Sequence, residues 1–296
     1  MFIGLVLGCT GGEALDTSAR PDSSTPVDTA VAAPPNWHEG TTVFTTFDLG
    51  DEHGCGLLTD GTTHCWGQDH YGQLQAPDGT WTALGLGEDH SCALATDGHL
   101  ACWGSDTTGQ SEPPSGTFTA LAVGDWHGCV LDAVGAVTCW GQPSLTHAPE
   151  GVFVSLAAGV AHTCALDAAG AAHCWGSCKS GACTPPDDGP FTTLTAGTDH
   201  TCALRPDGEI VCWGEEAASA APSGDYQAFD AGEGATCALD AAGTLGCWGT
   251  STGGVLDAPK ISFVEVSVAL YYACALGEDG TLGCWGVDLA GQTEPP

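Results

Sequence analysis

Cysteine is the residue type whose spacing carries the most chemical information in this chain of 296 residues. The pattern Cys-x9-Cys-Trp-Gly occurs seven times, and its first cysteine recurs every 35 to 38 residues. Two thiols at a fixed separation can close a disulfide or bind zinc, but zinc motifs usually pair cysteines two to four residues apart. The spacing therefore predicts one disulfide in each repeat. The expected pairs are Cys55–Cys65, Cys92–Cys102, Cys129–Cys139, Cys164–Cys174, Cys202–Cys212, Cys237–Cys247 and Cys274–Cys284.

A glycine at a fixed position sets the register of the two strands that carry each pair. Glycine stands six residues after the first cysteine in all seven repeats. A three-residue hairpin loop ending in this glycine, over residues 59–61, places Cys55 opposite Cys65 at a non-hydrogen-bonded site. Cα atoms there lie about 4.5 Å apart, within the disulfide range of about 4.4–6.8 Å. A two-residue turn would place Cys55 opposite Trp66 instead.

Alternating side chains place each hairpin in a larger unit. A leading segment such as 81–86 alternates at period two, which predicts a third strand in each repeat. The tryptophan of each repeat faces a small residue across the hairpin, so the indole can cover the neighbouring unit. Lone three-stranded sheets cannot bury both faces, whereas stacked copies can. The sequence predicts an all-β, seven-bladed propeller of short, disulfide-stapled blades. We expect Phe44 to Leu49 to close the ring by pairing into the last blade or directly beside it.

Several motifs resemble one known repeat family. They are Cys-Trp-Gly-Gln-Asp-His-Tyr-Gly-Gln-Leu at 65–74 and the Gly-x-x-His-x-Cys-Ala-Leu strands, which are similar to the regulator of chromosome condensation repeat family. Trp-Gly-x4-Gly-Gln recurs at 103–110 and 285–292. The resemblance covers about residues 43–296 and implies a seven-bladed propeller, closest in repeat length to secreted bacterial members. It implies the fold and no functional position, because no nucleotide-exchange or light-sensing residue of the family is matched.

Histidine precedes the first cysteine by two residues in five repeats. A metal or proton site is conceivable at one radius of a ring, but a residue repeated at one register more often satisfies buried backbone groups. We therefore interpret these histidines as scaffold. Nucleophile-elbow, metalloprotease and phosphate-binding motifs are absent, so we expect no enzyme and no metal or other cofactor. The five residues are His53, His90, His127, His162 and His200.

The segments that follow each Trp-Gly differ between repeats and are the expected binding rim. One of them contains Cys178 and Cys183, which we expect to form a local disulfide in an exposed loop. Varying loops on a repeat scaffold are where binding usually resides. The candidate binding residues are His70, Tyr71 and Lys179.

The first residues resemble the end of a bacterial lipoprotein signal. Residues 1–9 close on Val-Leu-Gly-Cys, which makes Cys9 the expected lipidation site. Residues 10–36 are rich in Thr, Ser, Asp, Pro and Ala and predict a disordered tether. The propeller is expected over 37–296. Sixteen cysteines besides Cys9 form an even number, which fits an oxidised, extracytoplasmic domain.

Charge limits the partners of the protein. The chain has 37 acidic and four basic residues, with a formal net charge of −33, which excludes nucleic acid as a direct partner. The sequence predicts a lipid-anchored binding scaffold on the bacterial cell surface or outer membrane, with a protein ligand on its rim and membrane contact only through the anchor. The alternative is an extracellular hydrolase or lyase with a site in the central channel.

Overall fold

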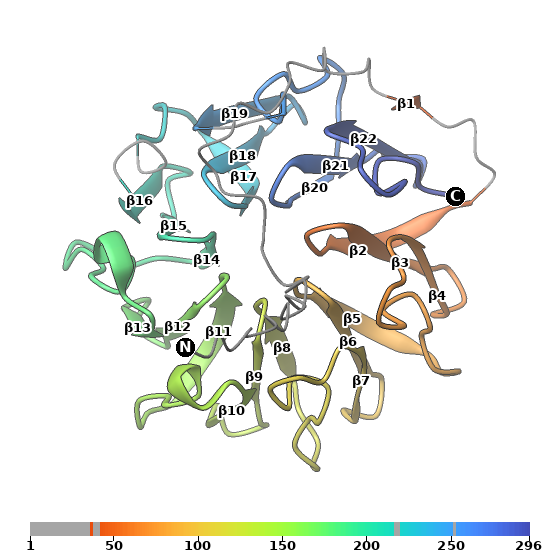
Figure 1. Ribbon diagram of the computed structural model, residues 1–296. Helices are drawn as coiled ribbons and strands as arrows, with labels where there is room; N and C mark the ends of the chain where they lie inside the picture. Colours follow the sequence, from red (N-terminus) through yellow and green to blue (C-terminus); the bar gives the residue numbers. More distant parts are fainter. Residues whose placement is uncertain (1–35, 38–41, 216–219, 251–252) are drawn as a thin grey trace, which may run out of the picture.

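Seven small antiparallel sheets stand around a central axis as the blades of a propeller (Figure 1). The computed structural model describes residues 36–37, 42–215, 220–250 and 253–296. Three consecutive strands make up each blade, and the first of them lies nearest the axis and the third farthest from it (Figure 1). The prediction of an all-β propeller with seven three-stranded blades is confirmed.

The strands fall into three concentric sets, with two short 3-10 helices in the connecting loops. The inner strands are β2 (Phe44–Leu49), β5 (Trp81–Leu86), β8 (Ala120–Val123), β11 (Phe153–Ala158), β14 (Thr193–Ala196), β17 (Tyr226–Ala231) and β20 (Glu265–Val268). The middle strands are β3 (His53–Leu58), β6 (His90–Ala95), β9 (His127–Leu131), β12 (His162–Asp167), β15 (His200–Leu204), β18 (Ala235–Asp240) and β21 (Tyr272–Leu276). The outer strands are β4 (Thr63–Gly67), β7 (Leu100–Gly104), β10 (Val137–Gly141), β13 (Ala172–Gly176), β16 (Ile210–Gly214), β19 (Leu245–Gly249) and β22 (Leu282–Gly286). The 3-10 helices are η1 (Pro143–Leu145) and η2 (Lys179–Gly181).

The middle and outer strands of every blade have the register that the hairpin glycine predicts. Gly61 has a φ of 81°, and Leu58 N donates to Thr62 O at 2.9 Å, which closes the three-residue loop. Cys55 then faces Cys65, and the equivalent pairing holds in all seven blades. All seven disulfides are formed, with Cα separations of 4.0–4.1 Å. These separations fall below the expected 4.4 Å, because the narrow non-hydrogen-bonded pair already brings the two backbones close.

The hydrophobic core is divided into layers between neighbouring blades. The disulfide of one blade packs against the tryptophan of the next, as Cys55 does with Trp103 and Cys164 with Trp213. The seven first cysteines are fully buried and the seven tryptophans are buried. Each indole covers the adjacent unit, as the alternation of side chains predicts.

The ring closes in the second of the two ways expected for Phe44–Leu49. Strand β2 pairs with β3 in its own blade and not with the last blade. It lies directly beside the last blade, because Phe44 N donates to Gly280 O at 2.9 Å. The strand that joins the last blade is β1 (Asn36–Trp37), which pairs with β22 as a fourth, outermost strand. Each blade already holds three strands of its own, so closure adds a strand without exchanging one.

Candidate functional site

The two faces of the propeller carry different connections. The hairpins between middle and outer strands, such as residues 59–61, define the hairpin face. On the opposite loop face, Gly67 at the end of β4 pairs with His53 at the start of β3. The loops that follow each Trp-Gly therefore leave from the loop face, which is the expected binding rim. Residues 216–219 and 251–252 of two of these loops lie outside the described residues, as do Cys9 and the expected signal and most of the tether.

The loops of the rim are attached to the blades beside them. The indole nitrogen of Trp103 donates to Gln73 O at 2.7 Å, which is a carbonyl in the loop of the preceding blade. The same contact joins Trp66 to Gln292 O, Trp140 to Gln110 O, Trp213 to Ala182 O and Trp285 to Val255 O, at 2.7–2.9 Å. Each such loop is therefore a cap over the next tryptophan, and its inner part is structural.

Buried glutamines hold three of these caps in shape. Gln73 is fully buried, and its Oε1 accepts a hydrogen bond from Tyr71 N at 2.8 Å. Gln110 and Gln292 accept equivalent bonds from Thr108 N and Ala290 N, both at 2.7 Å. The glutamine of Trp-Gly-x4-Gly-Gln thus folds the loop back on itself. The sequence carried this signal, but the interpretation of the whole loop as a varying binding segment missed the structural role of its glutamine.

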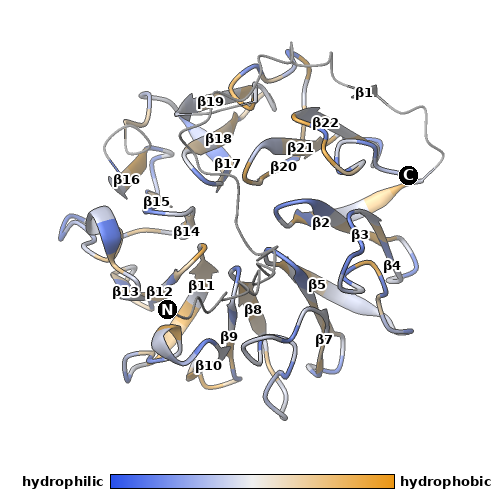
Figure 2. Ribbon diagram, in the orientation of Figure 1, coloured by the Kyte–Doolittle hydropathy of each residue, from blue (hydrophilic) through white to orange (hydrophobic). Residues whose placement is uncertain are grey.

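A disulfide replaces the glutamine in the loop of the fourth blade. Cys178 and Cys183 are bonded, as predicted, with a Cα separation of 5.0 Å. Between them, fully buried Ala182 presents its carbonyl to Trp213 Nε1 at 2.7 Å and to Thr201 Oγ1 at 3.2 Å. The disulfide therefore shapes a cap for the next blade and does not merely stiffen a loop tip. Lys179 is exposed on hydrophilic η2 in this loop (Figure 2).

The predicted binding residues lie on the rim but in two separate places. His70 is exposed and Tyr71 is 56% exposed, at the tip of the loop after β4. Lys179 lies after β13, so the second and third blades stand between the two sites (Figure 1). Leu289, which the sequence analysis missed, is 61% exposed in the corresponding loop of the seventh blade, directly beside the first. The tips of the first and seventh loops therefore offer apolar side chains on adjacent blades.

The channel narrows at the loop face to a ring of small residues. The inner strands end at six glycines and one alanine, which line a cavity of about 110 Å³. A Cβ on Gly50 would lie 2.3 Å from Gly87 O of the next blade, and one on Gly159 would lie 2.0 Å from Gly197 O. Only glycine lets neighbouring blades approach this closely. The lining residues of the ring are Gly50, Gly87, Gly124, Gly159, Gly197, Gly232 and Ala269.

Four of the five repeated histidines join neighbouring blades behind this ring, and both ring nitrogens of the fifth, His90, are buried without a hydrogen-bond partner among the residues that the structure describes. His53 Nε2 lies 2.9 Å from Ser91 Oγ, and the Ser91 hydroxyl donates to Gln73 O at 3.2 Å, so the imidazole donates from Nε2. His127, His162 and His200 reach Thr163, Thr201 and Thr236 in the same way, at 2.7–2.9 Å. These four histidines therefore have a structural role, but they bond to side-chain hydroxyls and not to the backbone groups that the sequence analysis expected.

Burial keeps these imidazoles neutral. All five are fully buried, and desolvation disfavours the imidazolium form. It lowers the pKa of His53, His90 and His127 to about 3 and of His162 and His200 to about 4. In the seventh blade Tyr272 takes the place of histidine, and its hydroxyl lies within hydrogen-bond distance of the carbonyls of Gly50 and His53, at 3.0 and 2.7 Å. Tyr272 thus joins the last blade to the first.

Two aspartates on inner strands each link three consecutive blades by hydrogen bonds. Asp48 on β2 accepts from Ser267 Oγ of the seventh blade at 3.3 Å and from Leu86 N of the second at 2.9 Å. Asp230 on β17 accepts from Thr195 Oγ1 of the fifth blade at 2.7 Å and from Val268 N of the seventh at 2.8 Å. The second, third and fourth blades have Gly85, Ala122 and Ala157 at this position of the inner strand. One wall of the channel is therefore polar and the other is small and apolar.

The polar wall gathers carboxyl groups whose ionisation is disfavoured. Burial and then the charge of Asp230 raise the pKa of Asp48 to about 7, and burial raises the pKa of Asp230. Burial also raises the pKa of Glu265, which accepts from Thr46 Oγ1 at 2.7 Å. Asp48 can therefore exchange a proton near neutral pH. Within the described residues no group of three or more His, Cys, Asp or Glu side chains is arranged to hold a metal ion.

Comparison with known proteins defines the class as a β-propeller. The CRINKLY WD40 ectodomain of the Arabidopsis thaliana receptor kinase ACR4 shares 23% identity over 84% of this chain and 97% of its own, with a TM-score of 0.74. The ectodomain of the Physcomitrella patens receptor kinase CR4 shares 25% identity over 83% of this chain and 74% of its own, also with a TM-score of 0.74. Prp20p from Saccharomyces cerevisiae shares 17% identity over 83% of this chain and 82% of its own, with a TM-score of 0.65.

The repeats identify the kind of propeller. The model of the regulator of chromosome condensation (RCC1) repeat matches residues 44–73, 81–110 and 191–217. The protein is a seven-bladed propeller that carries RCC1 repeats, as the sequence motifs indicate. A comparison with curated protein sequences gave no match. No helix in the described part of the chain has the length and apolar character needed to cross a membrane.

Proposed function

We propose that the protein is a binding scaffold that captures a protein ligand on the loop face. The observation that carries this proposal is the pair of exposed apolar tips, Tyr71 and Leu289, on neighbouring loops. The loops beneath them are held by Gln73 and Gln292, so the tips are presented by a rigid base. Rigid, exposed apolar side chains on a largely acidic surface favour binding of another protein.

Relatives of the same fold support a binding role. Prp20p is described with binding properties toward Gsp1p and histones, and two other similar propellers are ectodomains of receptor kinases. Nothing in this chain carries these partners over, because the likeness concerns the fold. It supports a propeller that acts by binding another protein.

An extracytoplasmic, lipid-anchored location is the second half of the proposal. Eight disulfides are typical of proteins that mature in an oxidising compartment. Cys9 follows a lipobox-like sequence, and residues 10–36 would then tether the propeller to a bacterial surface or outer membrane. Detergent-phase partitioning of the full chain and of the Cys9→Ala variant tests the anchor. If Cys9 carries the lipid, the unsubstituted protein enters the detergent phase and the variant does not.

An alanine series read by capture and by thermal stability tests the rim. Tyr71→Ala and Leu289→Ala should abolish capture of the ligand from surface extracts while leaving the melting temperature within about 2 °C. Lys179→Ala tests the separate site on the fourth blade. The exposed Thr80→Ala on the hairpin face is the matched control. Capture that survives all three rim changes would overturn the assignment of the ligand to this face.

The channel carboxyl groups favour one alternative, an extracellular hydrolase or lyase. Asp48 has a pKa near 7, which suits an acid or base at neutral pH. Both of its carboxyl oxygens accept hydrogen bonds from neighbouring blades, which supports the scaffold role instead. Turnover of a surface polymer that Asp48→Asn abolishes and Tyr71→Ala leaves intact would establish the enzyme.

A further inference from the structure

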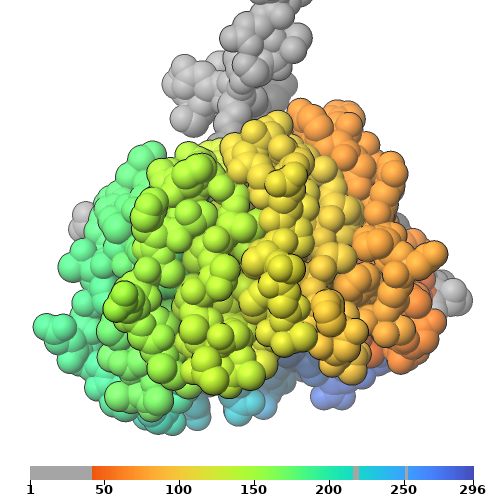
Figure 3. Space-filling model, turned by 90° about the horizontal axis from the view of Figure 1, so that it is seen from below, coloured from red at the N-terminus to blue at the C-terminus, as the bar shows by residue number. Residues whose placement is uncertain are grey.

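Three strongly exposed valines meet on the hairpin face where the third and fourth blades adjoin. Val134 is 72% exposed, Val152 63% and Val154 60%. The backbones that carry them are joined, since Phe153 N donates to Gly135 O at 2.8 Å. A Cβ on Gly135 would also lie 2.9 Å from Val152 Cγ1. The three exposed valines on these joined backbones are here called the valine patch. Figure 3 shows the side of the ring that is built by blades two to four, to which the third and fourth blades belong.

The other repeats serve as an internal comparison for this patch. Four of them have threonine where the fourth blade has Val154, and each threonine hydroxyl donates to a carbonyl of the middle strand at 3.1–3.3 Å. The seventh repeat has the exposed Val264 at this position. Val134 stands at a hairpin position where four repeats have an exposed aspartate. Only the junction of the third and fourth blades joins a valine at the hairpin position to valines on both sides of Phe153, and such an exposed apolar patch marks an interaction site.

A groove extends the valine patch along the third blade. It has a volume of about 440 Å³ and is lined by residues 114–118, Asp132, Ala133, Val134 and Thr138. The groove offers Pro114 and Phe118 on one wall and the Val134 hairpin on the other. An extended peptide segment can place one side chain in the groove and the next over the valines.

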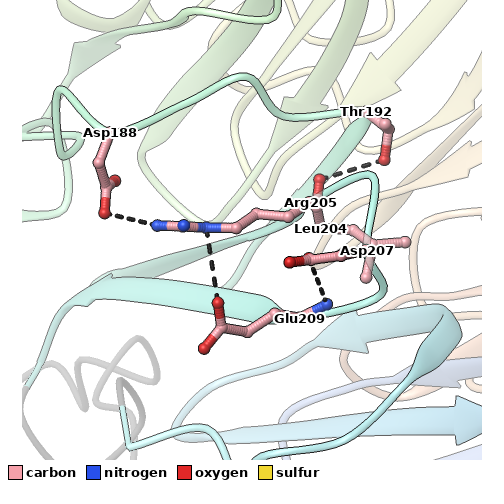
Figure 4. A network of polar contacts seen from close by, with 6 residues as sticks. All are labelled: Asp188, Thr192, Leu204, Arg205, Asp207 and Glu209. Carbon is pink, nitrogen blue, oxygen red and sulfur yellow. Dashed lines mark hydrogen bonds and ion pairs between the residues drawn. The ribbon is translucent and has the colours of Figure 1, made fainter.

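Two carboxyl groups border the patch and carry its negative charge: Asp132 lines the groove, and exposed Glu150 lies two residues before Val152. Asp167, which stands opposite Phe153 in the blade, already contacts His173 Nε2 at 3.1 Å. The three cations of the described residues lie elsewhere. Lys179 is on the loop face, and Lys260 precedes β20 in the seventh blade. Arg205 is engaged by Asp188 at 2.5 Å and by Glu209 at 3.8 Å, so its charge is already matched (Figure 4).

We propose that the valine patch and its groove form a second interaction surface, which binds an extended protein segment whose apolar side chains are flanked by lysine or arginine. The apolar part of the segment matches the valines, and its cations match Asp132 and Glu150. This inference rests on the proposed function as a binding scaffold but uses the opposite face from the rim. A second copy of the chain is a poor match, because its own charge of −33 repels.

The test uses the full chain and a labelled probe peptide, Lys-Lys-Ile-Val-Ile-Lys-Lys, followed by fluorescence anisotropy at low salt. Binding should weaken at least tenfold in a triple variant, Val134→Ala, Val152→Thr and Val154→Thr, which gives the patch residues that other repeats carry and leaves its charge unchanged. It should also weaken as salt rises, because ion pairs near the surface are screened. Tyr71→Ala with Leu289→Ala should leave peptide binding unchanged, which separates this surface from the rim.

Two matched peptides and two further measurements complete the test. Replacing the lysines by glutamate, or the apolar residues by serine, should abolish binding. Equal affinity of the triple variant and the unsubstituted protein, or binding of the glutamate peptide, overturns the proposal. Thermal melting confirms that the triple variant folds, and the single variant Val154→Thr serves if it does not. Sedimentation that shows a dimer broken by the triple variant would assign the patch to a second copy and also overturn the proposal.

Discussion

Asp48 in the channel and Asp60 at a hairpin tip are the same side chain in opposite surroundings. Hydrogen bonds from the Thr62 hydroxyl and then the Thr62 N–H lower the pKa of Asp60, which is fully exposed. Burial raises the pKa of Asp48 to about 7, despite two hydrogen bonds to neighbouring blades. The hairpin aspartate shapes one turn, whereas the channel aspartate joins three blades. The difference shows that the place of a side chain in the blade decides both its charge and its structural task.

The same division applies to the other polar side chains. Between blades, Trp103, His127 and Asp48 each contribute polar atoms that hydrogen-bond to a neighbouring unit. At the hairpins, Asp60 and its equivalents bond only within their own turn. The interior layer therefore holds the ring together, and four predictions test how far the two layers differ.

Trp103→Ala should have the largest effect. It removes a buried indole and leaves Gln73 O without its donor, so we expect a loss of about 3–5 kcal/mol in the free energy of unfolding. Urea titration followed by circular dichroism measures the loss. The exposed Tyr71→Ala in the same cap is the control and should change stability by less than about 0.5 kcal/mol. Comparable losses in the two variants would contradict the division into layers.

His127→Gln should change how the free energy of unfolding falls at acid pH. The folded pKa of His127, about 3, lies below the ordinary 6.5, so its contribution is present above pH 6.5 and is lost as pH falls toward 3. One such histidine lowers the free energy of unfolding by on the order of 2 kcal/mol as the pH falls from 6.5 to 5. The variant should therefore lose stability at pH 7 and show a shallower decline below pH 6.5. Unfolding free energies measured across this range would refute the burial argument if the two slopes were equal.

Asp48→Asn should change the pH dependence in the opposite sense. The folded pKa of Asp48 is raised above 3.8, so its contribution is full below that pH and is lost as pH rises through about 7. Asparagine keeps an oxygen for Leu86 N and cannot ionise. Relative to the unsubstituted protein, the free energy of unfolding of the variant should rise by on the order of 1–2 kcal/mol between pH 5 and pH 7. A constant difference across this range would show that Asp48 does not titrate there.

Asp60→Asn should have the smallest effect. Its lowered pKa makes a contribution that is present above pH 3.8 and is lost below it, but the side chain is fully exposed and bonds only to Thr62. Thermal melting at pH 5 and pH 8 should give nearly equal values for the variant and the unsubstituted protein. If the stability of Asp60→Asn relative to the unsubstituted protein rose with pH as much as that of Asp48→Asn, the two aspartates would not differ as described.

Much of the fold within each blade could be predicted from local sequence patterns. The hairpin register could be predicted because Gly61 and its equivalents need a positive φ at one place in a three-residue loop, and this alone brings the cysteines together. The packing of Trp103 over the neighbouring blade followed from alternation along the strand. The scaffold role of the histidines followed from their repetition at one register.

The remaining features depend on how blades meet. The pairing of Asp48 with Ser267, more than two hundred residues away, results from ring closure, which no local pattern encodes. The two-residue strand Asn36–Trp37 has too short a pattern to be recognised. The glutamine caps were visible in the motif at 65–74, but their role needs the tryptophan of the next blade in place. The exposure of Val154 likewise becomes informative only beside Val134.

The contiguity of each blade has a consequence for how such a ring can change size. No blade borrows one of its three strands from a distant part of the chain, so duplication of one unit of about 37 residues inserts a complete blade with its own staple. The ladders of the other blades stay unbroken, and only the angle between neighbours must readjust. The number of blades is then set by side-chain contacts between units, such as that of Asp48 with Ser267. A duplication or deletion of one unit can therefore change the number of blades without a new strand exchange at the closure of the ring.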